Sequence, residues 1–239
     1  MNHRPLTVAA LAAALSFPVL AVAQDSPQVQ APRSTVPVVE GAKYRDNMTL
    51  VGLADFLRGH PSRAADGHVH AIVEIPTGTN EKWEVKLDGT MRWDVKNGAV
   101  RVVHYLGYPG NYGIVPRAIL GKEIGGDGDP LDIVVLGPAA RRGELLKVRP
   151  VGVIRLIDAG EKDDKVLAVA ADGPLGDVED LADIEKRFVG ITTILQTWFE
   201  NYKGPGLLQC KGFGDRKEAE RLVEMAEKSY LVEERSREK

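Results

Sequence analysis

Apolar and polar positions follow a strand-like pattern through the middle of the chain and a helical pattern in its last third. Residues 82–87 alternate strictly between charged and apolar side chains, which is typical of a strand with one buried face. Strands are predicted at 68–76, 82–87, 99–106, 131–137, 145–157 and 165–171. Several short strands separated by Gly, Pro and charged turns favour a small closed antiparallel β-barrel.

Helical spacing takes over after residue 180. Between 180 and 204, apolar residues recur at intervals of three and four, and Gly204 is a natural end for one amphipathic helix. Residues 215–231 repeat this pattern, which predicts a second helix. A shorter helix is predicted within 48–59 from the spacing of its Leu and Phe residues. The expected fold class is therefore α+β, with the barrel flanked by two C-terminal helices.

The first 23 residues have the pattern of a secretory signal peptide. Arg4 precedes an apolar run from Leu6 to Ala23, which ends in an Ala-Val-Ala cleavage pattern. A membrane anchor is the alternative, but the run is short and rich in Ala. We expect export, with the periplasm as the compartment, cleavage after about Ala23 and no membrane span afterwards. Residues 24–66 are expected to form a tether and the short N-terminal helix, and 67–239 a folded domain.

Composition narrows the class of protein. Of the 239 residues, 44% are hydrophobic and 27% are charged, and the formal net charge of −3 gives no indication of a nucleic-acid-binding face. The single cysteine, Cys210, excludes an intramolecular disulfide and a cysteine-based zinc site.

Candidate chemistry is concentrated in the stretch GGDGDPLD. Asp127, Asp129 and Asp132 lie within six positions, immediately before a predicted buried strand. Three adjacent carboxylates repel one another, and a divalent cation removes that cost. An all-oxygen set suits Mg²⁺ or Mn²⁺. By itself, this stretch is equally compatible with an acidic surface turn, whereas Leu131 and Pro138 exclude a helix-loop-helix calcium site.

A second acidic cluster lies in the predicted hairpin turn DAGEKDDK. Asp158 ends one strand, and Asp163 and Lys165 begin the next, so five aspartates meet if both turns share a rim of the barrel. A charged turn is otherwise simply solvated. Further cationic and aromatic candidates, each compatible alone with a surface or core role, are Lys82, Arg101, Lys203, Tyr112 and Tyr202.

Five separated motifs, in order and at similar spacing, resemble those of the soluble family I inorganic pyrophosphatases. They are VEIPTGTNEKWEV, YPGNYGIVP, DGDPLDIVV, DAGEKDDK and WFENYKG, and the resemblance spans roughly residues 69–230. It implies a five-stranded, OB-like barrel within a catalytic domain at 67–239. It also implies a homo-oligomer that hydrolyses inorganic pyrophosphate to two phosphates with several Mg²⁺ ions. Residues 24–66 have no place in the minimal family pattern.

The resemblance assigns roles to the candidates. Asp129 resembles the residue that orients and deprotonates the attacking water. The residues that resemble metal ligands are Asp127, Asp132, Asp158, Asp163, Glu84 and Glu74. Those that resemble the residues holding the two phosphoryl groups are Lys82, Arg101, Tyr112, Lys165, Tyr202 and Lys203. Two alternatives remain: a non-catalytic module that binds Ca²⁺ or a polyanion, and a hydrolase of short polyphosphate or nucleotides.

Overall fold

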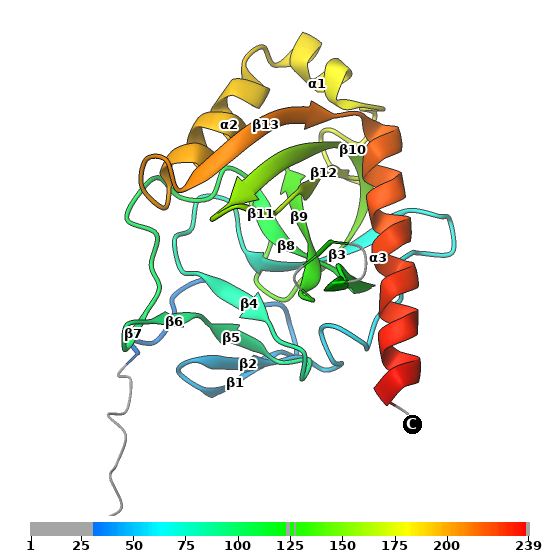
Figure 1. Cartoon of the computed structure of the whole chain (residues 1–239). Helices are drawn as coiled ribbons and strands as arrows, with labels where there is room; N and C mark the ends of the chain where they lie inside the picture. The colour runs from blue at the N-terminus through cyan, green and yellow to red at the C-terminus, as the bar shows by residue number, and fades with distance from the viewer. Residues whose placement is uncertain (1–30, 123–124, 127, 238–239) are drawn as a thin grey trace, which may run out of the picture.

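The computed structural model describes residues 31–122, 125–126 and 128–237, so the predicted signal peptide and Asp127 lie outside the described residues. Five strands form the centre of the molecule: β3 (Val69–Ile75), β8 (Asn111–Ile119), β9 (Pro130–Leu136), β12 (Lys165–Ala170) and β10 (Leu145–Asp158). They pair in the order β3-β8-β9-β12-β10, and β10 also pairs with β3, so the pairings form a complete ring (Figure 1).

One pairing in this ring differs from the antiparallel prediction, because β12 and β9 run parallel, with Val166 opposite Ile133. The chain reverses between β9 and β10 and again in the β10–β12 hairpin, so β12 returns in the direction of β9. Two strands missing from the prediction, β11 (Glu161–Lys162) and β13 (Leu208–Gly214), pair with β10. β8 was also missed, because its sequence begins inside the Gly-rich turn before Tyr112.

The prediction of a helix within 48–59 is wrong. β1 (Lys43–Asp46) and β2 (Thr49–Val51) instead belong to a four-stranded sheet with β5 (Met91–Trp93) and β4 (Trp83–Val85). The Asp55 carboxylate accepts hydrogen bonds from the backbone N–H groups of Leu57 and Arg58, which fixes a turn in place of a helical repeat. Residues 43–57 therefore pack on the body of the protein.

The strand predicted at 99–106 is reduced to β7 (Ala99–Val100), which pairs with β6 (Val95–Lys96). Beyond it, the hydrogen bonds go to a neighbouring loop: the Val103 N–H donates to the Asn80 carbonyl, and the Asn80 side chain donates to the Val103 carbonyl. The apolar residues here therefore do not form the buried face of a strand.

Three helices form in the described part of the chain, where two C-terminal helices were predicted: α1 (Leu181–Arg187), α2 (Ile191–Asn201) and α3 (Arg216–Arg237). The predicted helix at 180–204 breaks at Gly190, whose φ of 91° is left-handed, and the Glu185 carboxylate accepts from the N–H groups of Gly190 and Thr192. No helix in the described ranges is both long and apolar enough to cross a membrane.

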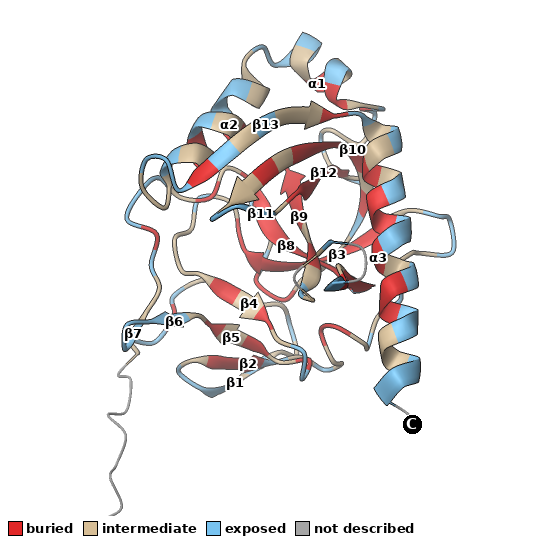
Figure 2. Cartoon of the chain, viewed as in Figure 1, coloured by how far each residue is buried: buried red, intermediate tan, exposed pale blue. Residues whose placement is uncertain are grey.

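The buried hydrophobic residues of the described ranges form three clusters. Figure 2 colours the buried positions red. One lies between the ring and α2, centred on Leu195, Trp198 and Phe199. A second joins the ring to α3, whose buried face includes Leu222 and Val223. The third lies beneath the N-terminal sheet and combines β1, β2, β4 and β5 with side chains from β3 and β8. The N-terminal sheet therefore shares a core with the ring.

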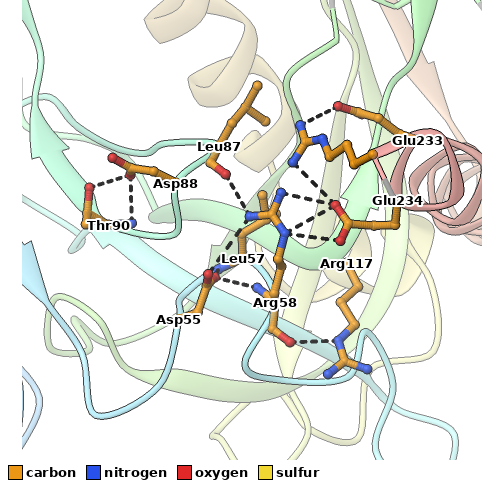
Figure 3. A network of polar contacts seen from close by, with 10 residues as sticks. Asp55, Leu57, Arg58, Leu87, Asp88, Thr90, Arg117, Glu233 and Glu234 are labelled. Atoms are coloured by element: carbon orange, nitrogen blue, oxygen red, sulfur yellow. Dashed lines mark hydrogen bonds and ion pairs between the residues drawn. The ribbon is translucent and has the colours of Figure 1, made fainter. Parts of the chain in front are cut away.

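Arg58 ties this N-terminal layer to the C-terminal helix (Figure 3). Its guanidinium donates to the Leu87 carbonyl at 2.7 Å and to the Glu234 carboxylate of α3 at 3.1 Å. The Arg58 carbonyl accepts from Nε of Arg117 at 2.9 Å. Because the Arg58 and Glu234 side chains are only 25% and 29% exposed, the pair is partly shielded from water.

We expect Arg58→Met to lower the free energy of unfolding by about 1–3 kcal/mol, since it removes hydrogen bonds to a charged group and leaves Glu234 without this partner. Urea denaturation measures the change. Arg45→Met is the matched control, because Arg45 is 58% exposed and its carboxylate neighbour Asp46 is 3.9 Å away. Equal stability of the two variants would contradict this role.

Candidate functional site

A cavity of about 450 Å³ lies where the ring meets β4 and the end of α2. Twelve of the thirteen side chains singled out from the sequence line it: Glu74, Lys82, Glu84, Arg101, Tyr112, Asp129, Asp132, Asp158, Asp163, Lys165, Tyr202 and Lys203. The thirteenth is Asp127, which is outside the described residues. The two acidic turns, about thirty residues apart in sequence, therefore face one space.

Strand register explains why these residues converge. Asp132 on β9 is opposite Ile114 on β8, and Val134, two residues further along, is opposite Tyr112. Residues two apart on a strand share a face, so Asp132 and Tyr112 point to the same side. Ile133 pairs with Val166 on β12, which places Lys165 beside Asp132 on the adjacent strand.

Lys165 occupies the centre of the acidic group. Its Nζ is 2.6 Å from Oδ2 of Asp132 and 2.8 Å from Oδ1 of Asp163, and the residue is 3% exposed. Burial alone would lower the pKa of Lys165, but the charges of Asp132 and Asp163 outweigh it and raise that pKa. Burial raises the pKa of Asp163, and the negative charge of Asp132 adds to the increase. Lys165 is thus a charged internal counterion for both carboxylates.

The other three cations predicted from the sequence also pair with carboxylates around the cavity. Lys82 Nζ is 2.6 Å from Oε1 of Glu84, and Lys203 pairs with Asp158. Burial opposes ionisation of Glu84, but Lys82 and a second lysine, Lys86, lower its pKa to about 2. Arg101 pairs at 2.6 Å with Asp94, a residue outside the predicted set. Acidic side chains therefore fix basic side chains at several points around the cavity wall.

Glu74 is the most enclosed carboxyl group of the site, at 2% exposure. Burial raises its pKa, the charge of Asp132 raises it further, and the Val85 N–H that donates to Oε1 only partly offsets these effects. Its hydrogen bond to Val85 links Glu74 to β4, the strand that carries Glu84. Glu74 therefore joins two walls of the site.

Aromatic side chains line one side of the site. Tyr202 follows α2 and stacks on Trp198, with ring centres 4.4 Å apart, while Tyr108 contacts the Tyr112 ring edge-on at 5.3 Å. Burial raises the pKa of both Tyr112 and Tyr202, so their hydroxyl groups stay protonated and can donate to an anion. The Lys165 ammonium lies 5.6 Å from the centre of the Tyr112 ring.

The donor chemistry of the cavity fits hard divalent cations. Among the described residues that line it, the metal-binding side chains are all carboxylates, and oxygen-only sets favour Mg²⁺ or Mn²⁺ over softer metals. No three acidic, His or Cys side chains in the described ranges already form a ready-made metal cluster, since Lys165 lies between Asp132 and Asp163. A cation bound by Asp132 and Asp163 would compete with Lys165 for these carboxylates.

Sequence reasoning missed Asp164, which lines the cavity, and Asp94, which pairs with the cavity-lining Arg101. Asp164 is 6% exposed, and its carboxylate accepts from the Leu156 N–H at 3.1 Å and pairs with Lys162. Its only signal was its place beside Asp163 in the hairpin turn. Asp94 had no comparable signal, because its pairing with Arg101 depends on the turn after β5.

Comparison with known proteins places this site in a family. The family model described as inorganic pyrophosphatase matches residues 71–231. Soluble inorganic pyrophosphatase 1 of Chlamydomonas reinhardtii is 41% identical over 168 residues, which cover 64% of this chain and 59% of that protein. The inorganic pyrophosphatase of Nanoarchaeum equitans is 34% identical over 170 residues, covering 68% of this chain and 97% of that protein.

Solved structures agree with the sequence comparison. The type I inorganic pyrophosphatase from Toxoplasma gondii superposes with a TM-score of 0.70 at 29% identity, covering 84% of this chain and 98% of that chain. The match spans only a little over half of the Chlamydomonas and Arabidopsis thaliana relatives, at 59% and 55% of their lengths. Since the family model matches residues 71–231, which include those that line the cavity, and a relative matched over 97% of its length is 34% identical, the chain belongs to the inorganic pyrophosphatase family.

Proposed function

We propose that this chain hydrolyses inorganic pyrophosphate to two phosphates in a Mg²⁺-dependent reaction. The observation that carries the proposal is the cavity in which Asp129, Asp132, Asp158 and Asp163 face Lys82, Arg101, Lys165 and Lys203. Such a mixed wall suits a polyanionic substrate that arrives with divalent cations: the carboxylates hold the cations, and the basic side chains hold the phosphates.

The carboxylates proposed to hold Mg²⁺, or Mn²⁺ in its place, are Asp127, Asp132, Asp158, Asp163, Glu84 and Glu74. Bound Mg²⁺ would neutralise charge on the substrate and lower the pKa of the attacking water. Asp132 is the central member of the set, because its strand position brings it beside both Lys165 and Tyr112. Glu74 is buried and its pKa is raised, so a cation bound beside it would favour its charged form.

The side chains of the protein then perform the remaining steps. Asp129 orients the water and accepts its proton. The basic side chains and tyrosines that line the cavity position the two phosphoryl groups for in-line attack. Water oxygen bonds to one phosphorus, the bridging P–O bond breaks, and the second phosphate leaves. Lys82, Arg101, Lys165 and Lys203 offset its charge, and Tyr112 and Tyr202 donate hydrogen bonds.

Three further expectations from the sequence stay proposals. The ring of strands is proposed to be the OB-like closed barrel of the family, supported by the β10–β3 pairing. Export to the periplasm is supported by the leader-like residues 1–23, and the assembly into a homo-oligomer by the family resemblance alone. Size-exclusion chromatography with light scattering and N-terminal sequencing of the exported protein test the last two.

The test of function is phosphate release from pyrophosphate by the purified chain, with Mg²⁺ and with chelator. We expect turnover with Mg²⁺ and loss of most of it after chelation, with partial recovery in Mn²⁺. Tripolyphosphate and ATP are the comparison substrates, because a second cavity of about 840 Å³ shares Arg101, Tyr202 and Lys203 with the first. Absence of turnover with Mg²⁺, alongside tight Ca²⁺ or polyanion binding, would favour a binding module instead.

A further inference from the structure

A buried arginine outside the predicted site connects the N-terminal segment to the residues around Lys82, immediately before β4. Arg142 is 0% exposed. Its Nη1 donates to Oγ of Ser34 at 2.8 Å, and Nη2 forms an ion pair with Oε2 of Glu81 at 3.0 Å, without the alignment of a hydrogen bond. Ser34 Oγ in turn donates to the same Glu81 oxygen at 2.6 Å. We call Ser34, Glu81 and Arg142 the Arg142 clamp.

The clamp contacts the two chain segments that bear Glu74 and Glu84. Nε of Arg142 donates to the backbone carbonyl of Glu74 at 2.9 Å, and its guanidinium lies 4.5 Å from the centre of the Trp83 ring. The Trp83 indole N–H donates to the same Glu81 carboxylate oxygen at 3.1 Å. Glu81 and Trp83 immediately flank Lys82, so both sequence neighbours of this lysine are fixed by the clamp.

The N-terminal segment supplies the third side of the clamp. The Val39 N–H donates to the Arg142 carbonyl, and the Arg142 N–H donates to the Pro37 carbonyl, both at 2.9 Å. Ser34 is 9% exposed and so is enclosed with its partners. This segment precedes the residues matched by the family model, 71–231, so Ser34 lies outside that match.

We propose that the Arg142 clamp is a positioning device that fixes Lys82 and Glu84 in the cavity, with Ser34 of the N-terminal segment as a working part. The inference rests on the proposed function for its kinetic consequences. A buried guanidinium is stable only with its partners in place, so the clamp permits few alternative geometries. A displacement of about 1 Å in a substrate-positioning group can cost up to about 100-fold in rate.

Ser34→Ala tests the clamp with a small change that leaves Arg142 and Glu81 paired. We expect kcat/KM for pyrophosphate to fall roughly 10-fold, through the loss of Lys82 positioning. The matched control is Thr35→Ala, which removes the next hydroxyl side chain along the segment, at an exposed position. It should leave kcat/KM within about twofold, as for most exposed substitutions. Glu81→Gln is the second variant and should have the larger effect, because it removes the carboxylate charge.

A double-mutant cycle separates positioning from general destabilisation. If the clamp acts through Lys82, Ser34→Ala should have little further effect on kcat/KM once Lys82→Met is present. Multiplicative effects of Ser34→Ala and Lys82→Met would overturn the proposal, as would unchanged kinetics in both Ser34→Ala and Glu81→Gln.

Hydrogen exchange supplies a readout that does not need activity. Amides of residues 81–87 should exchange faster in Ser34→Ala, whereas those of β12 should not. An inactive wild type would contradict the proposed function, yet the exchange result would still decide whether Ser34 holds β4. Unchanged exchange at 81–87 would show that it does not.

Discussion

Asp132→Asn is expected to lower kcat/KM for pyrophosphate by about 10³-fold or more. The change removes a carboxylate charge proposed to hold Mg²⁺, and a metal supplies several kcal/mol of charge stabilisation in the transition state. Asn keeps the size of the side chain, so the register of β9 against β8 and β12 should survive. Phosphate release at saturating Mg²⁺ measures the loss.

A thermal measurement separates lost cation binding from lost chemistry. Mg²⁺ that binds only the folded protein raises Tm, and we expect Asp132→Asn to lose much of that increase. Asp177→Asn is the control, since Asp177 pairs with Arg187 at the surface, with its side chain 66% exposed. Near-normal turnover and a full Tm increase in Asp132→Asn would show that this aspartate is not a metal ligand.

Lys165→Met is expected to lower kcat/KM by about 10²–10³-fold, the range seen when one charge-stabilising donor is removed from an active site. Lys165 lies between Asp132 and Asp163, so its removal also leaves two neighbouring carboxylates without their internal counterion. Without divalent cations, their mutual repulsion should lower Tm. The same assay and melting measurements, with and without Mg²⁺, follow both effects.

Asp132→Asn and Lys165→Met should differ in how much Mg²⁺ raises their Tm. In Lys165→Met, the freed carboxylates should keep or enlarge the Mg²⁺-induced rise in Tm, whereas Asp132→Asn should shrink it. Lys147→Met is the matched control, because Lys147 is a lysine of the neighbouring strand β10 that pairs with Asp66 at 41% exposure. Loss of the Mg²⁺ response in Lys165→Met would argue against its role as a counterion that the metal replaces.

Many of the strands could be predicted from the sequence, because buried strands have local patterns of apolar residues. The runs at 68–76 and 131–137 became β3 and β9, and the alternation at 82–87 contains β4. The helical pattern at 215–231 lies within α3. These signals were misleading where side chains bond to the backbone. Asp55 forms a turn where the N-terminal helix was predicted, and Gly190 with Glu185 divides the long helix predicted at 180–204.

The candidate site divides in the same way. The chemistry was only partly visible in the sequence: clustered carboxylates such as Asp129 and Asp132 suggested either a divalent metal or an acidic surface turn, and phosphate binding was implied by the family resemblance. The sequence could not decide whether these groups lie around one cavity. The strand pairings of the structure bring them together. The pairing of Arg101 with Asp94 had no local signal, and for Asp164 the only signal was its place beside Asp163 in the hairpin turn.

The order of residues alone therefore determined which chemical groups the protein has, since charge, donor type and periodicity are properties of the chain. Tertiary structure decided which groups touch: Lys165 became the counterion of Asp132 through the parallel β9–β12 pairing, and Ser34 reached Glu81, 47 residues away. Contacts between distant segments depend on strand register and on burial, where water no longer screens the charges, and neither is encoded in a local pattern.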